Sequence, residues 1–200
     1  MKNILIILLF SFISLYANID DFKTATWNMQ GSSASSEAKW SISIAQMFSG
    51  ANGIDVLAIQ EAGTLPATAQ PTGREFRAFG TSVVVTEHVW NIGTRLRPDL
   101  IFIYYARTDL GGNRVNLAIA SRRQADEVFL RPPPTTASRP MLGIRINNDA
   151  FFSIHALANG GADAYFSKTS TSKLFFNNLA TDKADIPAPK ISIFIFLLLR

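Results

Sequence analysis

The sequence predicts a layered domain that contains both strands and helix, of the α/β or α+β class. Several short apolar runs of strand length, bounded by turn residues, are spread along the chain. One stretch instead carries apolar residues at helical spacing. Elements of both kinds bury their apolar sides in packed layers. The length of 200 residues suits one domain, and the hydrophobic fraction of 48% is enough for a core.

The first expected elements are a strand, a helix and a second strand. Phe22 to Asn28 alternates apolar and polar residues, which is typical of a half-buried strand. Ile54 to Gln60 is a short apolar run bounded by turn residues, which indicates a buried strand. Between them a Ser-rich stretch and Glu37 favour the start of a helix. The apolar face of this helix is expected to hold Trp40, Ile44, Met47 and Phe48.

The following part of the chain predicts more strands and two loops. The loops are expected at Thr64–Gly73, which is rich in Pro, Thr and Gly, and at Arg131–Thr136, which holds three consecutive prolines. The loop Arg131–Thr136 is not a domain linker, because strands are expected on both sides of it. These further strands are Val83–Trp90, Asp99–Arg107, Val115–Ser121, Met141–Ile146 and Phe151–Leu157.

The two ends of the chain differ in pattern from the central body. Residues 1–17 have the features of a signal peptide, with Lys2 before an almost wholly apolar run and cleavage expected after Ala17. The alternative is an uncleaved anchor or a buried strand. Residues 164–200 lose the turn and strand pattern and end in an uncharged, β-prone run. We expect this segment to be an unrelated, out-of-frame tail and the domain to occupy residues 18–163.

The basic character of the chain does not indicate nucleic-acid binding. The net charge is +4, but residues 18–163 hold 13 basic and 13 acidic residues and are neutral overall. The excess comes from Lys2 and from residues 164–200. Cysteine is absent, which excludes disulfides, a thiolate nucleophile and a Cys-based zinc site.

Two residues at strand ends are candidates for catalysis and metal binding. Glu61 follows the expected strand Ile54–Gln60, where a carboxylate can bind a hard cation such as Mg²⁺ through oxygen. The alternative is a plain surface acid. His155 lies near the end of an apolar strand that opens into an Asn-Gly-Gly loop, where reactive groups are often exposed. The alternative is a structural histidine, which is also how we interpret His88.

Two further residues suit a phosphoryl group. Arg114 follows a Gly-Gly-Asn turn, and its planar guanidinium can donate two hydrogen bonds to phosphate. A hairpin-turn arginine is the alternative. Asn28 ends the first expected strand, where a turn-forming Asn is the alternative. Together the four residues suggest a phosphoryl site but do not name an enzyme.

Six short segments carry a more specific signal than these single residues. They are Thr26–Ser33, Ile59–Pro66, Pro71–Arg74, Asn113–Ala118, Arg131–Thr136 and His155–Gly161. In this combination and order, residues 18–163 resemble the family of cytolethal distending toxin B subunits, which lies in the endonuclease/exonuclease/phosphatase superfamily. The resemblance implies a DNase I-like fold of two packed mixed β-sheets flanked by helices, a four-layer sandwich that is incomplete in this chain.

The resemblance also implies a role for each candidate residue. Glu61 matches the Mg²⁺ ligand, and Asn28 matches the residue that orients the network on the metal side. Arg114 and Asn159 match positions that contact phosphate or DNA. His155 matches one of two catalytic histidines. The implied reaction is attack of an activated water on a phosphodiester, with Mg²⁺ neutralising the developing charge.

The implied function is that of the catalytic subunit of a secreted tripartite toxin, which travels with A and C subunits and hydrolyses DNA in the host nucleus. Two family segments, Gly-Asp-Phe-Asn and Ser-Asp-His, do not occur in the sequence, and a second catalytic His–Asp pair goes with them. We therefore expect this copy to be inactive. There are two alternatives to a toxin nuclease. The first is an inactive remnant or a subunit that only docks on A and C, and the second is a phosphoinositide phosphatase with the same catalytic residues.

Overall fold

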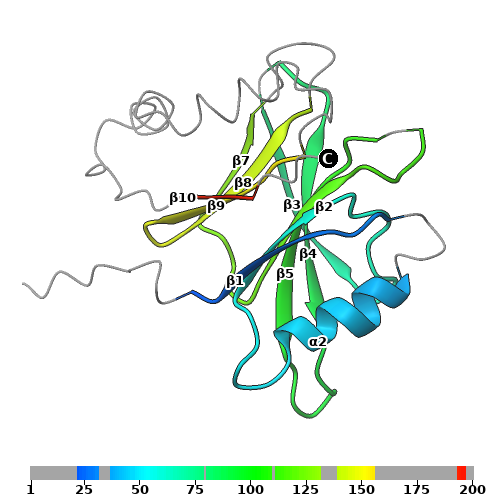
Figure 1. The fold of residues 1–200 in the computed structure, drawn as a ribbon, viewed down its shortest axis with the longest axis vertical. Helices are drawn as coiled ribbons and strands as arrows, with labels where there is room; N and C mark the ends of the chain where they lie inside the picture. Colours follow the sequence, from blue (N-terminus) through cyan, green and yellow to red (C-terminus); the bar gives the residue numbers. More distant parts are fainter. Residues whose placement is uncertain are drawn as a thin grey trace, which may run out of the picture.

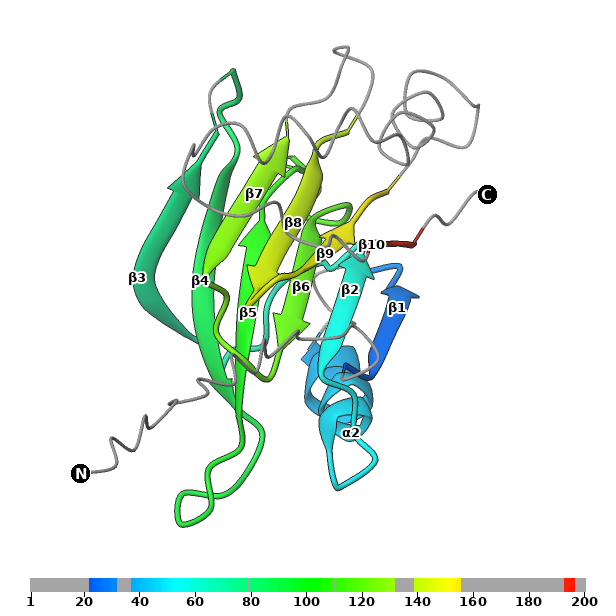
Figure 2. The same ribbon diagram turned by 90° about the vertical axis from the view of Figure 1, so that its left-hand side faces the viewer.

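Two β-sheets form the body of the chain in the computed structural model, which describes residues 22–31, 37–78, 80–109, 111–131, 139–155 and, by backbone alone, 193–196. The six-stranded sheet has the order β1-β2-β6-β5-β4-β3, and the four-stranded sheet has the order β10-β9-β8-β7 (Figure 2). The strands are β1 Thr24–Asn28, β2 Val56–Gln60, β3 Gln70–Arg77, β4 Val84–Asn91, β5 Leu100–Ala106, β6 Leu117–Ser121, β7 Glu127–Arg131, β8 Met141–Ile146, β9 Asp149–Ser153 and β10 Ile193–Phe196.

Both sheets are mixed. Strand β1 pairs with β2, and β10 pairs with β9, in parallel, whereas β2 with β6 and β8 with β9 are antiparallel. The predicted class of mixed sheets with flanking helix is therefore confirmed. The described part of the chain contains no helix that is long and apolar enough to cross a membrane.

One helix covers a face of the six-stranded sheet (Figure 1). It consists of a π-helical segment, η2 (Lys39–Ile44), that runs directly into α2 (Ala45–Phe48). Its residues Trp40, Ile44 and Phe48 are fully buried, as the apolar spacing predicted. Met47 is 36% exposed, so its assignment to the buried face was wrong. The buried positions follow a strict spacing of four residues, and Met47 falls beside that row.

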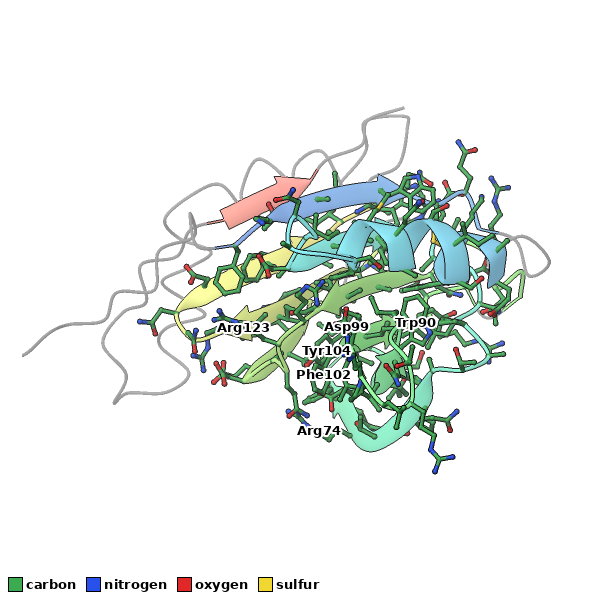
Figure 3. The ribbon with its side chains drawn as sticks, turned by 90° about the horizontal axis from the view of Figure 1, so that it is seen from below. Arg74, Trp90, Asp99, Phe102, Tyr104 and Arg123 are labelled. Atoms are coloured by element: carbon green, nitrogen blue, oxygen red, sulfur yellow. The ribbon has the colours of Figure 1, made fainter. Side chains whose placement is uncertain are left out.

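The six-stranded sheet separates two hydrophobic cores. The first lies between the sheets and joins residues such as Tyr104 of β5 to Ile144 of β8 and Phe151 of β9. The second lies under the helix, where Trp40 packs edge-to-face on Trp90 of β4 at 5.9 Å. Trp90 and Tyr104, both labelled in Figure 3, thus belong to opposite faces of one sheet. The strand ends that carry the candidate residues stand between these two cores.

Two strands were missed by the sequence analysis. Strand β3 overlaps the predicted loop Thr64–Gly73, and β7 runs directly into the predicted loop Arg131–Thr136. Strand β3 lies at the edge of its sheet, and most of its residues are exposed, so burial imposes no apolar pattern. Its pairing with β4 is also irregular between Pro71 and Glu75. Strand β7 has only three apolar residues between charged ones.

Several predictions concern residues that the structure does not describe. The signal peptide at residues 1–17 and, within the expected tail, residues 164–192 and 197–200 lie outside the described residues, so the predictions for both segments remain predictions. Within the expected tail, β10 pairs with β9, and Ile193 lies opposite Ala150.

Candidate active site around Glu61

Glu61 stands at the junction of two parallel strands. It follows β2 directly, and its φ of +49° places it in the left-handed region, which is unusual for a residue with a side chain. Its backbone oxygen accepts a hydrogen bond from the Gly31 amide at 2.8 Å. A side-chain carbon at Gly31 would lie 2.5 Å from this oxygen, so only glycine permits the close approach. This hydrogen bond and close backbone contact hold the segments after β1 and β2 next to each other.

The structure brings the candidate residues together on the Glu61 carboxylate. Asn28 Nδ2 donates to Oε1 at 3.1 Å, and Arg114 Nε lies 3.3 Å from Oε2. His155 Nε2 lies 3.5 Å from Oε1. These side chains come from the ends of β1, β2 and β9 and from the turn before β6. Asn159, the fifth predicted residue, lies outside the described residues.

The burial of these groups divides them by role. The side chains of Glu61 and His155 are 9% and 11% exposed, whereas that of Arg114 is 59% exposed. A buried carboxylate and imidazole have fixed positions, because their rotamers are restricted by packing. The exposed guanidinium can turn from Glu61 to an incoming anion.

Arg139 is a site residue that the sequence analysis missed. Its Nη1 lies 2.7 Å from His155 Nδ1. A guanidinium only donates, so Nδ1 must accept, and the proton of a neutral His155 is then on Nε2, the atom nearest Glu61. A signal for Arg139 was present: Ile146 pairs with Asp149 across a two-residue turn, and this register carries the start of β8 to the end of β9.

A buried amide network holds the loops of Glu61 and Arg114 together. Asn116 is fully buried, and its Nδ2 contacts the Tyr105 hydroxyl at 2.6 Å and the Gly63 carbonyl at 3.1 Å. The Tyr105 hydroxyl in turn donates to the Gly63 carbonyl at 2.6 Å. Burial raises the pKa of the Tyr105 phenol to about 12, so the group stays neutral and continues to donate.

The start of the helix supports the same loops from the other side. Lys39 Nζ donates to the carbonyls of Met29 and Gln30, just after β1. Trp40 Nε1 donates to the Ala62 carbonyl at 3.3 Å. The helix therefore fixes the chain on both sides of the Asn28–Glu61 contact.

One oxygen of Glu61 is suited to a cation. Oε2 is buried and has no hydrogen-bond donor, although Arg114 Nε is within ion-pair distance. A lone carboxylate oxygen of this kind fits Mg²⁺, which typically takes one or two carboxylates and completes its shell with water and phosphate oxygens. Among the described residues no group of three His, Cys, Asp or Glu side chains gathers here, so Glu61 would be the main ligand from this part of the chain.

Comparison with known proteins identifies relatives of the whole central body. The chain is 49% identical over 162 residues to a homolog of the cytolethal distending toxin B subunit from Salmonella typhi, a match that covers 80% of this chain and 60% of that protein. It is 50% identical over 161 residues to the cytolethal distending toxin B subunit of Escherichia coli, a match that covers 80% of this chain and 59% of that protein. The chain thus spans less than two thirds of the length of these relatives.

Solved structures and a family model agree with these relatives. The Haemophilus ducreyi cytolethal distending toxin matches with a TM-score of 0.68 and 49% identity, over 78% of this chain and 63% of that one. The toxin from Actinobacillus actinomycetemcomitans also has a TM-score of 0.68, with 50% identity over 78% of this chain and 62% of that one. The predicted resemblance is confirmed. The model of the Endonuclease/Exonuclease/phosphatase family matches residues 25–189, and the chain belongs to this family.

Proposed function

We propose that this site hydrolyses phosphodiester bonds of host DNA, as the catalytic subunit of a cytolethal distending toxin, with Mg²⁺ bound at Glu61. The observation that carries the proposal is the convergence of a guanidinium and a buried imidazole on one buried carboxylate, at 3.3 Å and 3.5 Å. The toxin B subunits of Salmonella typhi and Escherichia coli compared above share about half of their residues with this chain over the matched length, which supports the same chemistry.

Each side chain has a task that follows from its contacts. Arg114 and Arg139 carry planar positive groups that suit a phosphate, and the exposed Arg114 is free to reach one. His155 holds its proton on Nε2, from which it can donate to an oxygen of the phosphate group or the leaving group. Asn28 fixes Oε1 of Glu61. A bound Mg²⁺ would supply positive charge that stabilises the charge developing on phosphate.

The assembly and destination follow from the resemblance alone. We propose that the chain is secreted through its N-terminal signal peptide, associates with toxin A and C subunits, and acts in the host nucleus. The support is the name of the relatives and the apolar N-terminal run, since residues 1–17 are not described.

A plasmid-nicking assay with the full chain in excess over supercoiled DNA tests the proposal. Because the second His–Asp pair is absent from the sequence, we expect nicking far below the rate of a complete family member. The residual nicking should need Mg²⁺ and should be lost in Glu61→Gln and His155→Ala, because each variant removes one group that acts on the phosphate. Arg95→Ala, an exposed arginine in the β4–β5 connection, is the matched control and should nick like the unaltered chain. Equal nicking by Glu61→Gln and the unaltered chain would contradict the proposal.

A second candidate function is non-catalytic docking on the A and C subunits. The observation that favours it is that the described residues place only one acid and one histidine at the site. It predicts no nicking by the unaltered chain at any Mg²⁺ concentration, together with retained binding to the A and C subunits. Release of phosphate from a polyphosphorylated inositol lipid in vesicles, without plasmid nicking, would instead identify a phosphoinositide phosphatase.

A further inference from the structure

Two adjoining hollows open beside the site on the six-stranded sheet. The first has a volume of about 330 Å³ and is lined by Thr64, His88 and Asn113, among others. The second has a volume of about 300 Å³ and extends to Arg77 on β3. Thr86, Tyr105 and Arg107 line both, so the hollows form one groove, here called the β4–β5 groove. Its strand residues alternate with core residues such as Val85 and therefore share one face of the sheet.

The β4–β5 groove begins at the loops that carry the site. Asn113 Nδ2 donates to Thr64 Oγ1 at 2.8 Å across its entrance. Asn113 directly precedes Arg114, and Thr64 directly follows Gly63, whose amide donates to the Arg114 carbonyl at 3.2 Å. The entrance of the β4–β5 groove is therefore adjacent to Arg114 and to the loop that follows Glu61.

The charge of the groove suits an anion. Arg107 is exposed, and it takes part in none of the ion pairs found among the described residues. The one acid in the lining, Glu75, is already paired with Arg77 at 3.0 Å. Burial lowers the pKa of His88, so this imidazole is neutral and adds no charge. As far as the described residues show, Arg107 is thus the groove cation without an acidic partner.

We propose that the β4–β5 groove is a subsite for the polynucleotide phosphate next to the one at Glu61, with Arg107 as its cation. The inference rests on the proposed phosphodiesterase function and names its substrate as a chain of at least two phosphates. The two hollows adjoin through three shared lining residues, and apolar Leu65, Val83 and Val84 line them along with the polar groups. This mixed and extended lining suits a strand in which phosphates are separated by less polar sugars, whereas an inositol headgroup carries its phosphates around a single ring.

Binding of fluorescein-labelled hexathymidylate to the full chain, followed by anisotropy in EDTA, tests the subsite without turnover. Arg107→Ala should weaken binding about three- to tenfold and lower the slope of log affinity against log salt by about 0.7, the value for one lost phosphate contact on a single strand. Arg107 is exposed, so its removal leaves the core intact. Arg95→Ala removes the same charge at the opposite end of β5 and should change neither quantity.

Three results would overturn the subsite. The first is that Arg107→Ala and the unaltered chain bind hexathymidylate with equal affinity. If His155→Ala abolishes nicking in that case, the phosphodiesterase proposal stands and only the subsite fails. The second is an equal loss in Arg107→Ala and Arg95→Ala, which would show only a general effect of charge. The third is a loss seen with vesicles that carry a polyphosphorylated inositol lipid but not with hexathymidylate, which would assign the groove to a headgroup.

Discussion

Replacement of Asn116 by alanine should destabilise the chain, because it removes the hydrogen bonds that connect the loops of Glu61 and Arg114. The two amide hydrogens of Asn116 are shared among Gly63, Tyr105 and Asn113, and its Oδ1 accepts from the Asp109 amide at 2.9 Å. Each such bond contributes about 1 kcal/mol net, and a stranded buried partner costs about 1–3 kcal/mol. The Gly63 carbonyl keeps the Tyr105 hydroxyl, so mainly the Asp109 amide is stranded. The expected loss in the free energy of unfolding is therefore about 2–4 kcal/mol.

Urea unfolding followed by circular dichroism measures this loss. With a slope of about 2 kcal/mol/M, the midpoint of Asn116→Ala should fall by about 1–2 M. Asn52→Ala is the control and should shift the midpoint little. Asn52 lies in an exposed turn, and its side chain forms no hydrogen bond with any described residue. If Asn116→Ala unfolds at the same urea concentration as Asn52→Ala, the amide network does not hold the two loops, and our account of how the site is built is wrong.

Three further predictions concern single groups near the site. The pKa of Tyr105 is raised to about 12 in the folded chain, above its usual value near 10. This phenol therefore contributes stability below about pH 10, and the contribution is lost as pH rises through 12. Ultraviolet titration of tyrosinate should show the raised pKa, and Tyr105→Phe should remove the contribution. Arg139→Ala removes the donor that sets the His155 tautomer and should slow any nicking by about tenfold or more, whereas an unchanged rate would exclude this role. Hydrogen bonds from the backbone amides of Arg114 and neighbouring residues lower the pKa of Asp109. Asp109→Ala should therefore reduce the protection of these amides against hydrogen exchange, measured relative to the intrinsic exchange rate at each pH. In the unaltered chain this protection should be lost only as pH falls through the lowered pKa.

The strand ends that carry the site could be predicted because their strands are buried. Strand β2 is buried at every position, and a short apolar run bounded by turn residues is typical of such a strand. Glu61 is the charged residue that directly follows this strand, just before the turn-forming Gly63. The same reasoning placed a strand beside His155, but its bounds were wrong: Phe151–Leu157 was predicted, whereas β9 is Asp149–Ser153 and His155 follows it. Buried strands impose an apolar pattern that survives in one sequence, and their ends follow from it.

The contacts between those strand ends could not be predicted in the same way. That Arg139 meets His155 depends on the register of β8 with β9, which a single sequence indicates only through a short turn. The β4–β5 groove depends on β3, an exposed edge strand that leaves no apolar pattern. In both cases the information lies in the pairing of strands and not in the strands themselves.

The distance between the acid and the histidine depends on how the two sheets pack, because Glu61 extends from one sheet and His155 from the other. A buried polar tie fixes this packing next to the site. Ser153 Oγ donates to the Ile59 carbonyl at 2.9 Å, and Gln60 Nε2 donates to Ser153 Oγ at 3.2 Å. Gln60 directly precedes Glu61, and Ser153 lies two residues before His155. Apolar packing alone leaves small shifts between sheets permitted, but a shift of even about one ångström here would break both bonds in a dry interior. The tie therefore sets the register of the sheets at the one place where the carboxylate and the imidazole must meet.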